Sequence, residues 1–308
     1  MSYLDLYSSG ELLLRIREAF RSLSACDLCP HDCGVNRIKG ERGICGGGFK
    51  PKIASANVHH GEEPPVSGSK GSGTIFLSGC SLKCVFCQNF PISQFGNGEE
   101  ISSFDLAVRM FKLQKQGVHN INFVTPTHYL PQVLAALWHA APMGLRLPII
   151  WNSSGYEKVD ALRLLDGVVD IYLPDMKYSN DFDAVEISSA PGYCSINRAA
   201  VTEMLRQVGH LQVDDDGIAS RGLIIRHLVL PEGRAGSYRT LPWIAENLGL
   251  ETHIALMSQY FPAYKATMIA GIDRPVNLSE YDEAVNSLED VGLDNGWVQD
   301  LDEERCVV

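Results

Sequence analysis

The 308-residue sequence has no apolar run near the roughly 20 residues that a membrane-spanning helix needs. It also lacks an excess of basic residues, because 26 Lys and Arg stand against 37 Asp and Glu, for a formal net charge of −11 at pH 7. Nonspecific binding to nucleic acid or to a membrane surface depends on basic patches, so the composition disfavours both partners. Residues 1–5 contain an acid and no basic stretch leading into an apolar one, so we expect no secretory signal and a cytoplasmic protein.

Cysteine is abundant and clustered. Seven of the nine cysteines fall into two groups, CxxCxxxC followed by a fourth cysteine, and CxxxCxxC. The odd total and a reducing compartment argue against a disulfide framework. Clustered thiolates indicate zinc or iron–sulfur ligation instead, because sulfur is a soft ligand that suits both.

The two groups differ in the number of ligands that they supply. Cys26, Cys29, Cys33 and Cys45 can provide all four protein ligands of a closed site, either a structural zinc or a 4Fe–4S cluster. The second group has only Cys80, Cys84 and Cys87, and the next cysteine is Cys194. Three thiolates on a cubane leave one iron open to a substrate or cofactor, and open coordination is typical of catalytic metal sites.

Six apolar, strand-like runs alternate with helix-like segments after the cysteine-rich region. They cover residues 74–79, 120–125, 147–151, 168–173, 223–230 and 253–257. This alternation predicts an α/β fold with a parallel sheet covered by helices, and periodicity alone leaves an open sheet and a barrel-like curl as alternatives. No GxGxxG follows the first run, so a dinucleotide-binding loop is not expected.

Polar residues follow the ends of these runs. The CxxxCxxC group begins directly after the first run, and polar segments follow four others, at 125–128, 152–155, 174–177 and 258–260. In parallel barrels the chemistry lies at the carboxyl ends of the strands. We therefore expect these segments to form a catalytic face.

The segment from Cys80 to Cys87, with Phe86 before the last cysteine, is similar to the signature of radical S-adenosylmethionine (SAM) enzymes. Other segments resemble the PflX subgroup, which is related to pyruvate formate-lyase activating enzymes. They are residues 29–35, 40–45, 67–76, 87–89, 122–128, 173–178 and 226–231. The resemblance extends from about residue 26 to the C-terminus.

The resemblance implies a partial (β/α)6 TIM-like barrel. On this basis we expect an N-terminal helix and cysteine-rich metal-binding region at residues 1–66, a radical SAM core at 67–275, and a C-terminal helix with an acidic tail at 276–308. It further implies a 4Fe–4S cluster on Cys80, Cys84 and Cys87, with the amino and carboxylate groups of SAM on the fourth iron. An electron from reduced flavodoxin or ferredoxin would then cleave SAM to a 5′-deoxyadenosyl radical that abstracts hydrogen. Activating members of the family install a glycyl radical on a partner enzyme.

The resemblance also suggests SAM contacts at the strand ends. Many relatives carry a Gly-Gly-Glu-like stretch after the second strand, where this chain has Thr125-Pro126-Thr127-His128 and so lacks the carboxylate. The expected contacts are Thr125, Thr127, Asn152, Ser154, Asp175, Lys177 and Arg226. Asp175 and Lys177 share one face of an extended segment, and an ion pair without a catalytic role is the alternative for them.

Two other functions stay open from the sequence. One is a radical SAM enzyme that modifies a small molecule or a peptide. The other is a non-catalytic adaptor whose two cysteine groups hold zinc.

Overall fold

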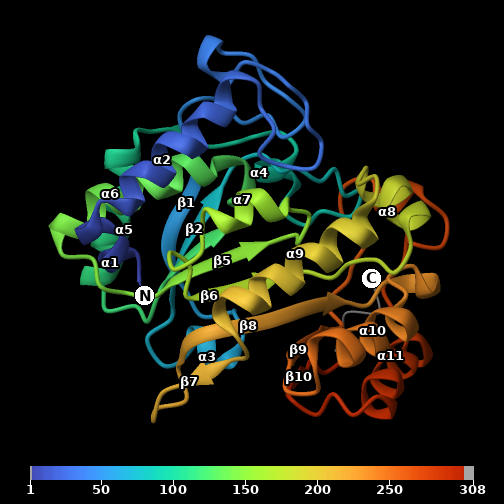
Figure 1. Ribbon diagram of the computed structural model, residues 1–308. Coiled ribbons are helices and arrows are strands. Elements are labelled where there is room, and N and C mark those ends of the chain that lie inside the picture. The colour runs from blue at the N-terminus through green and yellow to red at the C-terminus, as the bar shows by residue number, and fades with distance from the viewer. Residues whose placement is uncertain (1, 302–308) are drawn as a thin grey trace.

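The computed structural model describes residues 2–301, so most of the predicted acidic tail lies outside the described part (Figure 1). Ten strands form one sheet in the order β10-β9-β8-β6-β5-β4-β2-β1-β3, with β7 paired to β8. The strands are β1 (Lys52–His59), β2 (Ser72–Leu77), β3 (Glu99–Glu100), β4 (Ile121–Val124), β5 (Ile149–Ser153), β6 (Ile171–Pro174), β7 (Gln212–Val213), β8 (Ala219–Leu228), β9 (His253–Met257) and β10 (Gly296–Val298).

All six predicted strands are present, as β2, β4, β5, β6, β8 and β9, and each pairs in parallel with the next. The α/β class is therefore confirmed. β1 runs antiparallel to β2, and β10 extends the parallel series beyond β9. Within residues 2–301, β3 and β10 end the order without pairing to each other, so the sheet is not closed and the TIM-like barrel stays a prediction.

Eleven α-helices connect or cover these strands in the described part of the chain. They are α1 (Tyr3–Ser9), α2 (Glu11–Arg21), α3 (Pro64–Ser67), α4 (Phe90–Ser93), α5 (Ser103–Lys115), α6 (Leu130–Met143), α7 (Val159–Arg163), α8 (Asp181–Ser188), α9 (Tyr193–Val208), α10 (Ser237–Leu248) and α11 (Leu278–Asp290). Figure 1 shows α1, α2, α5 and α6 grouped beside β1 and β2, whereas α10 and α11 lie beside β9 and β10. None of the helices within residues 2–301 is both long and apolar enough to cross a membrane.

Side chains alternate between the two faces of the parallel strands. Phe123 and Trp151 belong to the main core, which the helices also build. The opposite face carries a smaller apolar cluster that includes Ile150, Leu173 and Ile224 and packs on Val66 of α3.

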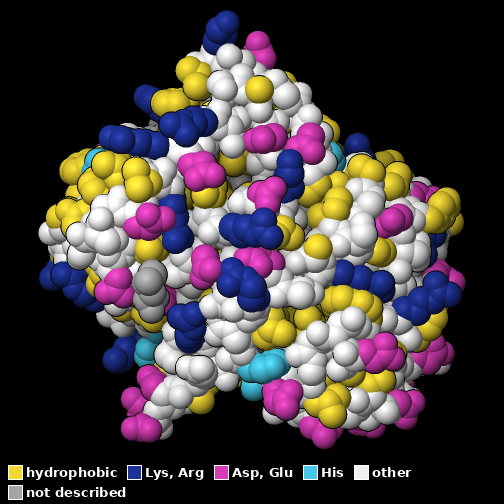
Figure 2. Space-filling view, viewed as in Figure 1, with side chains coloured by type: hydrophobic (Ala, Val, Ile, Leu, Met, Phe, Trp, Pro, Cys, Tyr) yellow, Lys and Arg dark blue, Asp and Glu magenta, His cyan; other side chains and the backbone are white. Residues whose placement is uncertain are grey.

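Asn152, Asp175 and Arg226 each follow a member of this smaller cluster by two residues, so the period of two places them on the same face, toward the carboxyl ends of the strands. The fold thus gathers three expected site residues on one face. On the exterior, Figure 2 shows basic and acidic side chains interspersed over the visible surface.

Candidate active site

The CxxxCxxC loop begins at Cys80, three residues after β2 ends at Leu77. Gly79 has a left-handed backbone (φ 85°), and a Cβ at this position would lie 2.3 Å from the carbonyl oxygen of Cys45. Only glycine fits such a close backbone approach without strain. The loop carrying Cys80 is therefore packed directly against the N-terminal cysteine region.

Each sulfur of the loop has a polar neighbour. The Ser188 hydroxyl donates to Cys84 Sγ at 2.9 Å, and the Leu82 N–H donates to Cys80 Sγ at 3.3 Å. Cys87 Sγ and the Ser93 hydroxyl are 3.0 Å apart. Hydrogen bonds to cluster-ligating sulfurs are one means by which proteins set a reduction potential, so this environment suits thiolate ligands.

Burial raises the pKa of two of these thiols, Cys80 and Cys84, and so favours their neutral form. It raises the pKa of Cys80 to about 12, with a further contribution from the Cys84 thiolate. It raises the pKa of Cys84 to about 11, although the Lys177 ammonium and the Ser188 hydroxyl oppose it. A bound cation would therefore have to displace protons to hold the thiolates, as metals generally do at cysteine sites.

Lys177 and Asp175 lie beside the loop. Their side chains form an ion pair at 2.6 Å. Burial disfavours the Lys177 ammonium, but Asp175 and the thiolates of Cys84 and Cys87 outweigh burial and raise the pKa of Lys177. The ion pair named as the alternative thus exists, and it places a cation whose side chain is only 16% exposed near the thiols of Cys84 and Cys87.

Arg226 is engaged by carboxylates from the connector before α3. Its Nε and Nη2 donate to Glu63 at 2.5 and 2.7 Å, Nη2 also donates to Glu62, and Nη1 donates to Asn152 Oδ1 at 3.3 Å. Burial opposes the Arg226 charge, but Glu63 and Glu62 outweigh it and raise the arginine pKa. The sequence did not suggest these two glutamates, which lie more than 160 positions away in the chain.

Thr127 points into a buried network rather than toward the cysteine loop. Its hydroxyl donates to Glu157 Oε1 at 2.9 Å, and the same carboxylate accepts bonds from Trp151 Nε1 and the Ser153 hydroxyl. Thr125 has a left-handed backbone (φ 57°), which is strained for a β-branched residue. Such strain concentrates at functional sites.

Asn122 is a site candidate that sequence reasoning missed. It lies on β4 between Ile121 and Phe123, which face the main core, so its side chain faces the same side as Asn152. It is fully buried, and neither Nδ2 nor Oδ1 has a hydrogen-bond partner in the described structure. A buried, unsatisfied amide points to a missing ligand or water. An asparagine within an otherwise apolar strand was the available signal.

Backbone hydrogen bonds hold the loop around the first two of the four N-terminal cysteines. The Gly34 N–H donates to the carbonyl oxygen of Cys26 at 3.0 Å, and the Asp32 N–H donates to that of Cys29 at 3.1 Å. Burial raises the pKa of Cys29 to about 12, and the other three thiolates raise it further. The four groups are thus electrostatic neighbours, although no three Cys, His, Asp or Glu side chains in residues 2–301 are arranged to hold a single metal ion.

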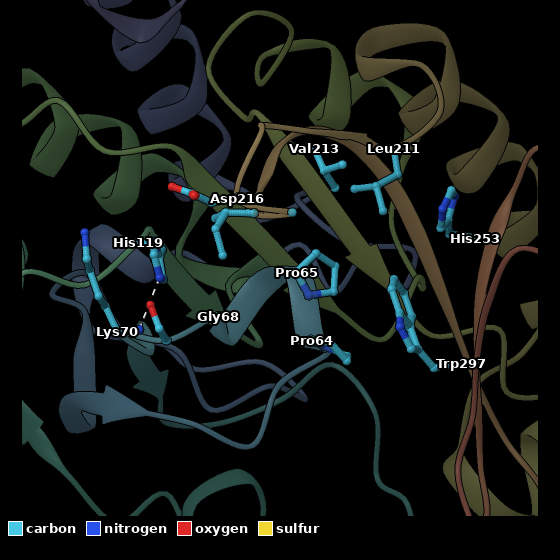
Figure 3. Close-up of a pocket in the computed structure, with 13 residues that line it drawn as sticks. Pro64, Pro65, Gly68, Lys70, His119, Leu211, Val213, Asp216, His253 and Trp297 are labelled. Carbon is cyan, nitrogen blue, oxygen red and sulfur yellow. Dashed lines mark hydrogen bonds between the residues drawn. The ribbon is translucent and has the colours of Figure 1, made fainter.

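A separate cavity of about 620 Å³ lies at the opposite, amino-terminal edge of the parallel strands (Figure 3). His119, Ile218 and His253 line it, and they stand just before β4, just before β8 and at the start of β9. The backbone N–H of Lys70 donates to His119 Nε2 at 3.2 Å. None of the expected metal or SAM residues lines this cavity, so it is distinct from the cysteine face.

Comparison with known proteins gives one close curated relative. No family model matches the chain. The uncharacterized protein MJ0674 of Methanocaldococcus jannaschii is 32% identical over 291 residues, which cover 91% of this chain and 79% of the relative. A solved structure of TYW1 with a lysine-pyruvate adduct bound aligns over 75% of this chain and 77% of that chain, with a TM-score of 0.44 and 12% identity, a likeness too weak to carry an argument. By its identity and coverage, the chain belongs to the same family as MJ0674.

Proposed function

We propose that this chain is a radical SAM enzyme whose 4Fe–4S cluster is held by Cys80, Cys84 and Cys87. The observation that carries the proposal is the trio of thiols at the carboxyl end of β2, each with a polar neighbour and accompanied by the half-buried Lys177. When bound, the cluster would supply one electron to SAM coordinated at its open iron, and the resulting 5′-deoxyadenosyl radical would abstract hydrogen from a substrate.

The protein's own groups fit an anionic sulfur site. Ser188 donates to Cys84 Sγ, and the Leu82 N–H donates to Cys80 Sγ. Lys177 offsets part of the negative charge of three thiolates, which matters because unpaired charge is costly in a buried site. These groups would hold the ligands in place and adjust the potential at which the cluster accepts an electron.

The sheet face beyond the loop also fits a polar cofactor. Asn122 offers an unused donor and an unused acceptor, and Asn152 lies on the same face. Arg226 is already held by Glu62 and Glu63, so we assign it to ordering this face rather than to pairing with the SAM carboxylate. Thr125, Ser154, Asp175 and Lys177 remain proposed SAM contacts, whereas the Thr127 hydroxyl is engaged by Glu157.

We further propose the PflX-like subgroup, with reduced flavodoxin or ferredoxin as the electron donor and a glycyl-radical enzyme as the partner. A small molecule or a peptide as substrate is the alternative. The partner proposal depends on the resemblance of residues such as 173–178 and 226–231. We also propose a second metal centre, zinc or 4Fe–4S, on Cys26, Cys29, Cys33 and Cys45, which are electrostatic neighbours and of which all but Cys33 are buried.

Product analysis tests the proposed function. Protein purified without oxygen should contain iron and sulfide, and dithionite with SAM should yield equimolar methionine and 5′-deoxyadenosine. A colourless protein with two zinc ions per chain and neither product would instead support the zinc adaptor. Adding a candidate glycyl-radical enzyme and recording its radical by electron paramagnetic resonance would test the activase assignment separately.

Ser188→Ala should weaken the cluster without removing a ligand. The change deletes the hydroxyl that donates to Cys84 Sγ, and loss of such outer hydrogen bonds commonly lowers metal affinity or activity about 10–100-fold. The measurement is the rate of iron loss to a chelator in the absence of oxygen. Ser195→Ala is the matched control, because that exposed hydroxyl donates only to the Gly192 carbonyl oxygen. Equal rates in the two variants would show that the Ser188 contact does not support a cluster.

A further inference from the structure

Arg37 is a buried cation without a carboxylate partner. Arg37 as a whole is only 1% exposed to solvent. Nε and Nη2 donate to the Gly48 carbonyl oxygen at 3.2 and 2.6 Å, and Nη1 donates to that of His128 at 2.7 Å. No Asp or Glu pairs with it within residues 2–301, in contrast to Arg226 with its two glutamates. Burying an uncompensated charge is strongly unfavourable, so an anion is expected nearby.

The groups near Arg37 that could become anionic are cysteine thiols, which lose a proton when they bind a metal. Its Nη1 lies 3.9 Å from Cys26 Sγ. A Cβ on Gly47 would lie 3.1 Å from Arg37 Nη2 and 3.3 Å from Cys45 Sγ, so the guanidinium and this second sulfur converge on the same glycine. The guanidinium also favours the thiolate form of Cys45, against the larger effect of burial on the pKa of that thiol.

The same arginine connects the region of the N-terminal cysteines to the CxxxCxxC loop. The His128 carbonyl oxygen accepts from Arg37, and His128 Nε2 donates to the carbonyl oxygen of Ser78, two residues before Cys80. His128 is buried, and burial lowers its pKa to about 3, so the imidazole is neutral and adds no competing charge. A second contact, between His31 Nε2 and the Ser81 carbonyl oxygen at 2.7 Å, lies nearby.

We propose that Arg37 is the buried counter-ion of a thiolate metal centre formed by Cys26, Cys29, Cys33 and Cys45. The inference rests on the second metal centre of the proposed function and is independent of SAM chemistry at the other three cysteines. Four thiolates around a doubly charged zinc ion or iron–sulfur core leave an excess of negative charge, and one buried guanidinium offsets part of it. Arg37 is thus a positioning residue that stabilises the ligands, not a ligand itself.

A purely mechanical role is the competing explanation. In that case Arg37 would only join the Gly48 and His128 carbonyl oxygens, and its charge would be irrelevant to the thiols. Lysine at this position keeps the charge but cannot reproduce the guanidinium's planar set of donors. Glutamine removes the charge. The two variants therefore separate the explanations.

The experiment uses the full chain with Cys80, Cys84 and Cys87 replaced by alanine, so that only the N-terminal cysteines are available as a thiolate centre. Iron, sulfide and zinc are quantified after anaerobic purification, which identifies the metal. Retention of that metal is then measured against increasing chelator. Arg37→Gln should retain it about 10–100-fold less tightly than the parent, the range typical of lost outer-shell partners, and Arg37→Lys should stay close to the parent.

Arg42→Gln is the matched control. This arginine lies in the same region, but its side chain is 48% exposed and pairs with Glu100, so its loss should leave metal retention unchanged. Equal retention in Arg37→Gln and the parent would overturn the proposal, as would a parent without metal. If Arg37→Gln does not fold, Arg37→Lys decides, because loss of metal from a folded Lys variant would favour the mechanical role. SAM cleavage by the wild-type protein is measured separately, so a failure of the proposed radical SAM function can be told apart from a failure of the proposed role of Arg37.

Discussion

Cys84→Ala should reduce SAM cleavage to the background level while the chain stays folded. The proposed 4Fe–4S cluster needs all three loop thiolates, and the next cysteine along the sequence is Cys194. Cys84 is buried and accepts a hydrogen bond from Ser188, so its truncation should cost about 1 kcal/mol of unfolding free energy, an ordinary value for a point substitution. The measurements are 5′-deoxyadenosine formation, iron content and the thermal unfolding midpoint.

Cys194→Ala is the control for this prediction. Cys194 belongs to neither group, and its thiol lies 3.6 Å from the Tyr178 carbonyl oxygen and beside the Asp181 carboxylate. Its loss should leave iron content and product formation near the wild-type values. Persistent turnover in Cys84→Ala, or equal loss in both variants, would contradict the assignment of the loop as the cluster site.

Arg226→Met should destabilise the fold by about 3–5 kcal/mol, the usual range for breaking a buried ion pair by removing one partner. Glu62 and Glu63 have side chains only 6% and 7% exposed, and both are paired with this guanidinium. Without the Arg226 guanidinium, the nearly buried carboxylates of Glu62 and Glu63 would lose the cation that offsets their charge. Chemical denaturation would report the loss as a lower midpoint.

Two comparisons make this second prediction specific. Arg163→Met removes a cation whose partner, Asp160, is 83% exposed, and exposed pairs contribute about 0–1 kcal/mol, so little change is expected. Adding Glu62→Gln and Glu63→Gln to Arg226→Met should recover much of the lost stability, because neither connector position then carries a carboxylate that has lost its cation. A loss below about 1 kcal/mol in Arg226→Met would show that the connector glutamates do not depend on it.

The fold could be predicted where apolar runs were long and continuous. β4, β5, β6 and β9 are buried along most of their length, so each gave an apolar run without alternation. β1 was not predicted because only one of its eight residues, Ile53, is buried. β10 has three residues, too few for any periodicity to emerge. Whether the sheet closes depends on pairing between strands that are distant in the sequence, and a local sequence pattern cannot predict such pairing.

The clustering of the cysteines could be predicted from the sequence, and the electrostatics around them less so. Cysteine spacing identified both thiol groups, and the period of two placed Asp175 and Lys177 on one face, where they are paired. The spacing could not reveal that Thr127 begins a short 3-10 helix and donates to Glu157, because that contact spans 30 residues. The partners of Arg226 and the isolation of Arg37 from carboxylates likewise arise only from tertiary packing.

The most direct test of the account is the spectrum of the reduced iron centre with and without SAM. Anaerobic protein reduced with dithionite should give the electron paramagnetic resonance signal of a 4Fe–4S cluster, and adding SAM should change that signal because the nucleoside binds the iron that Cys80, Cys84 and Cys87 leave open. Cys26→Ala, which alters only the N-terminal group, should preserve the SAM-dependent change. An iron-free protein, or a cluster signal from the loop that is identical with and without SAM, would contradict the claim that three thiolates leave an open iron for this cofactor.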